Sequence, residues 1–360
     1  MIKINNFAHM KKITTFVILF TLFFVACETE FEVSADWKEV AVVYGLLDQS
    51  NDQQYIKINK AYLGIGDALQ MASVADSINY NPADLEVKII KVKDGAFGSI
   101  DLLDSIYLDT TLIAKDDGLF ATDENIIYST SITDKSFFRA NDADEKDYIL
   151  SILNIKSGKK VWAKTNLIHQ LNLDIPFAKP MGFYASVPDP VVFPLEKALT
   201  TVNWFHSTNG KIYEIIARIY YTNFYDDNVD GIWDRDSLTY LDWLHPQVIY
   251  DGRNEMNYTF DGHDFVNTLA RKLSNEQNLL ARRLSHVELL FSVGSEDLQT
   301  YMDLNEPFEG LVQERPVFTN INNGIGFFSC RYNKSHTMLF PTATREGLSH
   351  DLDSLHFVYP

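Results

Sequence analysis

The sequence predicts a mainly β fold with minor helix, in which an N-terminal β-sandwich precedes a second β-rich domain carrying one or two helices. Three observations favour this class. Short segments of alternating apolar and polar residues are separated by turn residues, a stretch with five prolines lies at 173–194, and one long helical pattern follows it. We therefore expect a sandwich of the immunoglobulin or transthyretin-like type at 39–172, a linker at 173–194 and a second domain at 195–360.

The expected strands of the first domain are short. Alternation predicts strands at 40–47, 54–60, 85–92, 148–155 and 161–168. The polar run 48–52 has the composition of a turn that joins the first two strands. Residues 67–75 carry a loose helical stripe, which indicates a short helix inserted between strands.

The second domain combines hairpins with helices. Asn209-Gly210 lies between strand patterns at 201–205 and 211–221 and predicts a hairpin. A second hairpin joins 213–225 to 237–244 across an acidic tip. The best helical pattern covers 264–284, with basic residues toward its end. A buried strand at 286–293, a short helix at 295–302 capped by Ser295, and a strand at 325–331 complete the domain.

The first 27 residues have the layout of a bacterial lipoprotein signal. Lys11 and Lys12 precede an apolar run at 13–25, which a small residue and Cys27 close. The run is shorter than the ~20 apolar residues of an ordinary membrane span. We expect cleavage after residue 26, acylation of Cys27 by fatty acids such as palmitate, and an acidic tether at 27–38. A plain secretory signal without acylation is the alternative interpretation.

The charge balance argues against some partners. The chain has 31 Lys and Arg against 49 Asp and Glu, which gives a formal net charge of −18. Such a surface repels nucleic acid and anionic headgroups, and it is compatible with cationic ligands. With Cys27 acylated, Cys330 is the remaining thiol, so no intramolecular disulfide is expected. We expect Cys330 to be buried as a small apolar residue.

The acidic tip has the spacing of a Ca²⁺ loop. An Asp-x-Asn-x-Asp-Gly series begins at residue 226, and glycine at its sixth position permits the sharp turn. The possible Ca²⁺ ligands are Asp226, Asn228, Asp230, Asp234 and Asp236. The twelfth position is Ser237, where an EF-hand has a bidentate glutamate. A solvated acidic turn is the simpler interpretation.

Aromatic residues crowd the same hairpin. Alternation along a strand sends about half of them into the core. Trp233 is the best candidate for ligand binding, because it lies in the tip and not on a strand. Trp204 and Trp243 are expected to fill the core.

Catalytic signatures are missing from the sequence. It contains no Gly-x-Ser-x-Gly, His-Glu-x-x-His or Walker loop, and we expect no enzymatic activity. His286 with Glu288 and His263 with Asp264 form potential acid–base pairs, but neither pair has a third partner in the sequence pattern.

Several short stretches together resemble a family of Bacteroidota outer-membrane lipoproteins, domain of unknown function 4249. The matching stretches are 42–47, 202–204, 210–215, 240–243 and 318–328, the last with an Asn-Ile-x-x-Gly-x-Gly-x-Phe pattern. The resemblance implies a lipid-anchored protein of the outer membrane or the cell surface, with a TonB-dependent receptor as partner. It supplies no catalytic residues and no ligand. We expect an accessory ligand-capture protein; the alternative is a structural or adhesive surface protein that binds glycan or matrix.

Overall fold

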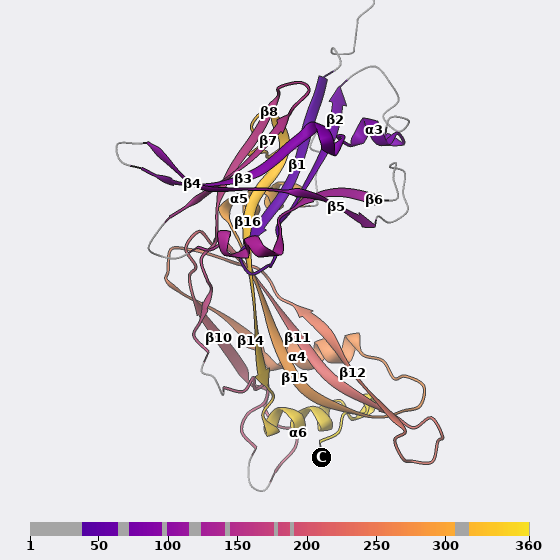
Figure 1. Ribbon diagram of the computed structural model, residues 1–360. Coiled ribbons are helices and arrows are strands. Elements are labelled where there is room, and N and C mark those ends of the chain that lie inside the picture. The colour runs from indigo at the N-terminus through magenta and orange to yellow at the C-terminus, as the bar shows by residue number, and fades with distance from the viewer. Residues whose placement is uncertain are drawn as a thin grey trace, which may run out of the picture. The chain divides into compact units, whose positions relative to one another are not determined.

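The computed structural model describes residues 38–63, 72–95, 99–114, 124–140, 145–175, 179–187, 191–306 and 317–359. The chain divides into two compact units. One comprises 1–39 and 62–67, of which only 38–39 and 62–63 are described. The other comprises 40–61 and 68–360 and holds the elements discussed below (Figure 1). The signal and most of the tether therefore lie outside the described residues.

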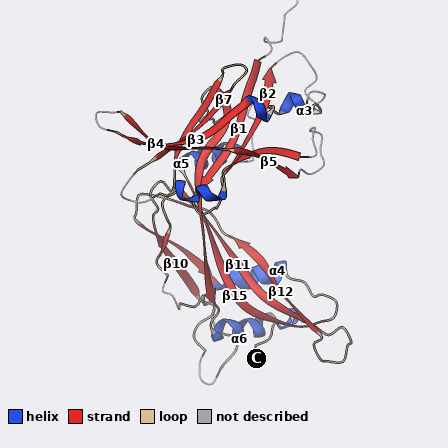
Figure 2. Cartoon of the chain, viewed as in Figure 1, coloured by secondary structure: helices blue, strands red, loops and turns tan. Residues whose placement is uncertain are grey.

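The fold is mainly β, as predicted, and strands dominate the chain in Figure 2. The largest sheet has nine strands in the order β12-β11-β15-β16-β1-β2-β6-β5, with β13 paired to β11. Its strands are β1 (Lys38–Asp48), β2 (Tyr55–Leu63), β5 (Asp109–Ala114), β6 (Glu124–Ser129), β11 (Ile212–Tyr225), β12 (Arg235–Leu244), β13 (Val248–Ile249), β15 (Leu279–Gly294) and β16 (Gly324–Leu339). The hairpin of β11 and β12 confirms the second expected hairpin.

Strand β16 joins sequence that is far apart. It runs parallel to β1 and antiparallel to β15, so residues before and after 173–194 share one sheet. Gly326 in β16 has a positive φ of 112°, and a Cβ there would lie 2.1 Å from the carbonyl oxygen of Val43. The second glycine of the Gly-x-Gly pattern is thus required by the close approach of β1.

A four-stranded sheet provides the second layer of the β-sandwich-like part. Its order is β4-β3-β7-β8, with β3 (Leu85–Asp94), β4 (Ile100–Tyr107), β7 (Asp147–Asn154) and β8 (Lys160–Asn166). Alternating residues of β3, such as Val87 and Ile89, join Ile56 and Val43 of the large sheet in one hydrophobic core. Strands β3, β7 and β8 confirm the expected strands at 85–92, 148–155 and 161–168.

The hairpin expected at Asn209-Gly210 is wrong. The turn itself forms, since Asn209 has a positive φ of 66° and the Gly210 amide donates to the Ser207 carbonyl oxygen at 2.8 Å. The flanking strands, however, belong to different sheets. β10 (Leu199–Phe205) lies between β14 (Glu255–Asp261) and β9 (Asn172–Leu173), whereas β11 pairs with β12, β13 and β15. Burial of Trp204 in the core favours this separation over local pairing.

The helices are short, and the expected helix at 264–284 is wrong in its second half. In the described ranges the helices are α3 (Ala75–Ile78), α4 (Gly262–Lys272), α5 (Glu296–Asn305), α6 (Thr342–Asp351) and the 3-10 turns η2 (Pro82–Asp84), η4 (Ile132–Phe137) and η5 (Asp353–Leu355). Asp261 caps α4 by accepting from the His263 amide at 2.7 Å. The chain then turns at Asn278, with φ 61°, and Leu279 starts β15. Pairing with β11 overrides the helical pattern of 280 and 284.

Two further expectations for the helices have different outcomes. Ser295 caps α5, as predicted, by accepting from the Leu298 amide at 3.2 Å. The short helix expected at 67–75 lies largely outside the described residues, and α3 begins where it was expected to end. Helix α6 was not predicted.

The stretch expected to be the linker is partly buried. Met181 and Phe183 are fully buried in the core. The Met181 amide donates to the Leu339 carbonyl oxygen, and the Phe183 amide donates to the Thr344 hydroxyl at 2.9 Å. Prolines keep this stretch out of regular strands, but Met181 and Phe183 still pack in the core. The exact domain boundaries stay a prediction. Within the described ranges, no helix has the length and hydropathy needed to cross a membrane.

Candidate functional site

The hairpin of β11 and β12 separates its aromatic residues into two groups. Along β11, residues alternate between buried and partly exposed positions. Tyr221, Tyr225 and Trp243 point into the core, and Trp204 is also buried there, as expected for the two tryptophans. Tyr220, Phe224 and Tyr240 lie on the opposite side, because side chains two residues apart share a face of a strand. This solvent-facing group is the candidate site.

We call Tyr240, Tyr220 and His286 the aromatic row. They come from β12, β11 and β15, and Tyr220 is the direct register partner of Tyr240. The Tyr220 and His286 rings stack with centroids 4.4 Å apart and planes 12° apart, and the Tyr220 and Tyr240 rings lie 5.5 Å apart. A register shift between β11 and β15 beside Tyr220 places His286 there. Tyr240 remains 49% exposed, so the row presents ring surface to solvent.

A charged row lies beside the aromatic row. Asp242, Arg218 and Glu288 follow one another across the same three strands. Arg218 forms two hydrogen bonds to the Asp242 carboxylate, at 2.8 and 2.9 Å, and its guanidinium carbon lies 4.2 Å from the Tyr240 ring centroid. Hydrogen bonding from Arg218 holds the pKa of Asp242 below its usual range. The Tyr220 hydroxyl donates weakly to Glu288 at 3.4 Å.

The charged row and the aromatic row hold each other's side chains in position. A bidentate Arg–carboxylate pair has a defined geometry, and a guanidinium over a tyrosine ring adds a cation–π contact. The rings are therefore held in place before any ligand arrives. Rigid aromatic side chains with polar edges are suited to stacking on sugar rings or to packing against a protein partner.

Trp233 extends this surface at the acidic tip. Its ring meets Phe224 edge to face at 5.4 Å, and the guanidinium of Arg283 lies 5.2 Å from the Phe224 ring centroid. Trp233 is 55% exposed, which agrees with its expected place off the strands. We refer to the aromatic row, the charged row, Phe224 and Trp233 together as the aromatic face.

The side chains of the acidic tip form hydrogen bonds within the loop. The Asp226 carboxylate accepts from the amides of Asp230 and Gly231, at 3.0 and 2.6 Å. The Asn228 side-chain amide donates to Asp234 at 2.7 Å, and Asp230 accepts from the Ile232 amide. Asp236 lies on β12 opposite Phe224. Asp226, Asp230 and Asp234 thus use carboxylate oxygens to accept hydrogen bonds from the loop's own donors.

This hydrogen bonding agrees with an acidic turn, which was the simpler interpretation, and the Ca²⁺ site stays a prediction. Across the described ranges, no group of three or more His, Cys, Asp or Glu side chains is placed to hold a metal ion. The Asp/Asn spacing and Gly231 are not sufficient to predict a Ca²⁺ site. Asp and Asn side chains accept hydrogen bonds from loop amides as readily as they bind a cation.

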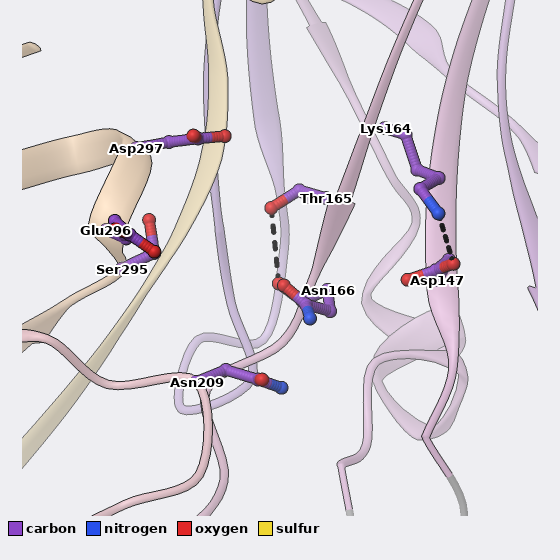
Figure 3. A pocket seen from close by; sticks show the side chains of 8 residues that line it. All are labelled: Asp147, Lys164, Thr165, Asn166, Asn209, Ser295, Glu296 and Asp297. Carbon is purple, nitrogen blue, oxygen red and sulfur yellow. Dashed lines mark hydrogen bonds and ion pairs between the residues drawn. The ribbon is translucent and has the colours of Figure 1, made fainter. Parts of the chain in front are cut away.

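A polar pocket of about 320 Å³ lies elsewhere in the structure (Figure 3). Its lining side chains are Asp147, Lys164, Thr165, Asn166, Asn209, Ser295, Glu296 and Asp297. Lys164 is paired with Asp147 at 2.7 Å, and Asp297 accepts from Asn320 at 3.0 Å. Glu296 and Asp297 occupy the first turn of α5, where their charges already complement the helix dipole. The pocket therefore does not favour an anion.

The remaining predicted residues have separate outcomes. Cys330 is buried, as expected, and burial raises the pKa of its thiol to about 12. Glu288 and His286 both lie beside Tyr220, in the aromatic face, and were considered in the sequence only as a possible acid–base pair. The His286 side chain has the Ser285 hydroxyl 2.9 Å from Nδ1.

Cys27 lies outside the described residues. Sequence reasoning missed Arg218 and Asp242, although their alternation with Tyr220 and Tyr240 was a usable signal. No protein-family model matches this chain, and no curated protein is detectably similar to it, so the resemblance to the lipoprotein family stays a prediction.

Proposed function

We propose that this chain is a non-enzymatic binding protein that a lipid on Cys27 holds at the outer membrane. In this proposal it serves as an accessory ligand-capture partner of a TonB-dependent receptor. The observation that supports binding is the aromatic face, where partly exposed rings are held by ion pairs and stacking. The signal pattern that ends at Cys27 supports the anchor.

The anchor is tested at its sulfur. Acylation forms a thioether on Cys27, which a serine oxygen does not replace. Cys27→Ser should abolish incorporation of labelled palmitate and leave the chain soluble or with its signal uncleaved. Unchanged lipid labelling and membrane fractionation in that variant would remove the anchor from the proposal.

The partner is tested on membranes with the intact protein. Mild solubilisation and affinity capture should recover a receptor-type barrel together with the parent protein. Trp233→Ala with Tyr240→Ala should lose most of that recovery, because exposed aromatic anchors carry much of the energy of an interface. Tyr55→Ala is a matched control, since Tyr55 is 46% exposed but lies on β2. Equal recovery with all three proteins argues against the aromatic face as the contact.

Trp233 favours a second candidate function. Its ring stands in a polar, acidic loop, an arrangement that suits stacking on a sugar ring in an adhesive surface protein. Binding of the purified protein to polysaccharide or matrix, lost in Trp233→Ala and independent of any receptor, would support adhesion over receptor assistance.

A further inference from the structure

A basic turn joins β7 to β8 in this otherwise acidic chain. Residues 155–160 read Ile-Lys-Ser-Gly-Lys-Lys, with lysines at 156, 159 and 160 and no carboxylate. All six residues are exposed. The Asp84 carboxylate pairs with Lys156 at 2.8 Å, and the turn keeps a positive charge even when Asp84 is included.

The backbone of the turn has a defined conformation. The Gly158 amide donates to the Asn154 carbonyl oxygen at 2.8 Å, and the Asn154 amide donates to the Lys159 carbonyl oxygen at 2.9 Å. The Ser157 amide donates to the side-chain oxygen of Asn154 at 3.0 Å. Gly158 supplies the positive φ, 69°, that closes the turn. The lysines are therefore attached to a turn that is formed before any partner arrives.

Two exposed apolar side chains flank the lysines. Ile155 is 61% exposed, and Trp162 on β8 is 38% exposed. Lys160 and Trp162 share the exposed side of β8, because side chains two residues apart lie on one face of a strand and Val161 between them is buried. Lysine and tryptophan are typical of surfaces that meet a membrane interface. We refer to residues 155–160 and Trp162 together as the basic turn.

The basic turn lies at the end of the fold where the chain arrives from Cys27. The Asn323 side-chain amide donates to the Lys160 carbonyl oxygen at 3.0 Å, and the next residue, Gly324, is the register partner of Ala41 in β1. The turn and the first part of β1 accordingly lie at the same end of the two layers (Figure 1). The chain from Cys27 to Ala41 spans at most about 50 Å when fully extended. A lipid on Cys27 therefore keeps this end within reach of the headgroups.

We propose that the basic turn contacts the anionic headgroups of the membrane that the lipid on Cys27 enters. This inference rests on the proposed lipid anchor and adds an orientation to it. A lipid attached through a single residue leaves the fold free to rotate, whereas a basic surface at a second point restricts that rotation. The net charge of −18 acts in the same sense, because an anionic membrane repels the rest of the chain while it attracts the basic turn.

The contact determines where the aromatic face lies. Strand β16 has 16 residues and runs from Gly324, beside Ala41, to Leu339, opposite His286 of the aromatic row. At about 3.3 Å per residue, its path is about 50 Å long. With the basic turn on the headgroups, the aromatic face is presented to the aqueous side. A partner then reaches it through a part that stands outside the bilayer.

Fluorescence quenching on vesicles tests the contact with the acylated protein. Ser157→Cys supplies a thiol for a dye in the basic turn, since Cys330 is buried and the lipid occupies Cys27. Ser237→Cys places the same dye on β12 as the matched control. With a quencher attached to the headgroups of vesicles that contain phosphatidylglycerol, the dye at 157 should be quenched several-fold more than the dye at 237. The difference should shrink in phosphatidylcholine vesicles and when the ionic strength rises from about 0.05 to about 0.5 M.

A charge reversal tests the lysines themselves. Each basic residue near an anionic surface adds to the attraction, so Lys159→Glu with Lys160→Glu should lower the equilibrium constant of the contact at least about tenfold. Lys135→Glu with Arg139→Glu is the matched control, because both side chains are exposed and Lys135 pairs with Asp52, beyond the other end of β1. This control should be quenched like the parent. Circular dichroism verifies the fold of each variant.

The possible failures are distinguishable. Mass spectrometry of each preparation shows whether Cys27 carries a lipid, and a chain without one contradicts the proposed anchor and this inference together. An acylated protein whose dye at 157 is quenched no more than the dye at 237 overturns the membrane contact alone. Equal quenching in phosphatidylcholine vesicles, or quenching unchanged by Lys159→Glu with Lys160→Glu, overturns the role of anionic headgroups.

Discussion

The Asp48 carboxylate accepts a hydrogen bond of 2.5 Å from the side-chain amide of Asn333, which lies 285 positions later in the chain. Asp48 ends β1 and is fully buried, and Asn333 lies on β16. The Ser50 amide donates to the other Asp48 oxygen at 2.9 Å, and the Ser292 hydroxyl of β15 donates to Asn333 at 2.8 Å. One polar chain thus crosses β1, β16 and β15.

Removing the Asn333 amide should destabilise the fold. In Asn333→Ala the buried Asp48 oxygen loses its donor, which typically costs about 1–3 kcal/mol of unfolding free energy. Urea denaturation measures the loss. Asp52→Ala is the control, because its ion pair with Lys135 is exposed and should contribute less than about 1 kcal/mol. Equal losses in the two variants would contradict the role of the buried pair.

Stability should fall in mild acid because of His245. Burial lowers the pKa of His245 to about 4, below its usual 6.5, and the ring packs against Trp243 and Phe260. Between these values the unfolded chain binds a proton that the folded chain does not, so folding weakens as the pH falls. From pH 7 to 5 the parent should lose roughly 2 kcal/mol that His245→Phe retains. His263→Gln, at an exposed ring, should behave like the parent in chemical denaturation at both pH values.

The Cys330 thiol should be unreactive in the folded protein. It is inaccessible, and a pKa of about 12 leaves little thiolate at pH 8. In a Cys27→Ser background, maleimide should label Cys330 only as urea unfolds the protein. Ser157→Cys, in an exposed turn, would supply a second thiol that labels at once in the native state. Rapid native labelling without that added thiol would show that Cys330 is accessible.

Neutralising Arg282 should be far more costly than neutralising its neighbour. The Arg282 guanidinium is 1% exposed and donates to Asn223 at 3.1 Å, to the Leu355 carbonyl oxygen at 3.2 Å and to Glu276 at 3.4 Å. Arg282→Met removes the donor to the Asn223 and Leu355 oxygens and the buried partner of Glu276, and we expect a loss of about 3–5 kcal/mol of unfolding free energy. Arg283→Met, on the exposed side of the same strand, should lose less than about 1 kcal/mol in the same unfolding experiment. Similar losses of unfolding free energy in the two variants would show that the hydrogen bonds of Arg282 contribute little to stability.

The acidic tip should depend on Asp226 and not on Ca²⁺. Asp226→Ala removes the acceptor of two loop amides, so limited proteolysis within 227–234 should become several-fold faster. Asp236→Ala, a substitution on the strand beyond the loop, should be cleaved at the same rate as the parent protein. The melting temperature should be the same in about 5 mM Ca²⁺ and in chelator, because the Asp226 carboxylate already accepts two loop amides. A Ca²⁺-dependent rise in melting temperature that Asp226→Ala abolishes would instead support the cation site.

Local patterns predict much of this fold. Alternation and turn residues identify β3, β7, β8 and the hairpin of β11 and β12, because each depends on neighbouring residues. They do not identify which strands pair over long distances. The placement of β16 between β1 and β15 and the separation of β10 from β11 depend on core packing across the chain. Leu280 and Leu284 fit a helical and a strand pattern equally well, and the neighbouring strand β11 decides between them.

The candidate site shows the same limit. Period-two alternation predicts that part of the aromatic hairpin faces solvent, and Trp233 does. His286 and Glu288 join the aromatic face from β15 through a register irregularity that no local pattern reveals. The oxygen spacing at 226–236 is also ambiguous by itself, because turn formation and cation binding use the same side chains.

The position of β16 sets the order in which the chain can complete itself. β1 is among the first strands to be synthesised, but its pairing partner β16 is synthesised more than 270 residues later. β15 also needs β16 as its partner and cannot complete its pairing before then. Contacts this distant in sequence make folding slow, and any chain that stops before residue 324 keeps two strands open for non-native pairing. Incomplete copies are therefore the form of this protein that quality-control proteases and holding chaperones should recognise most readily.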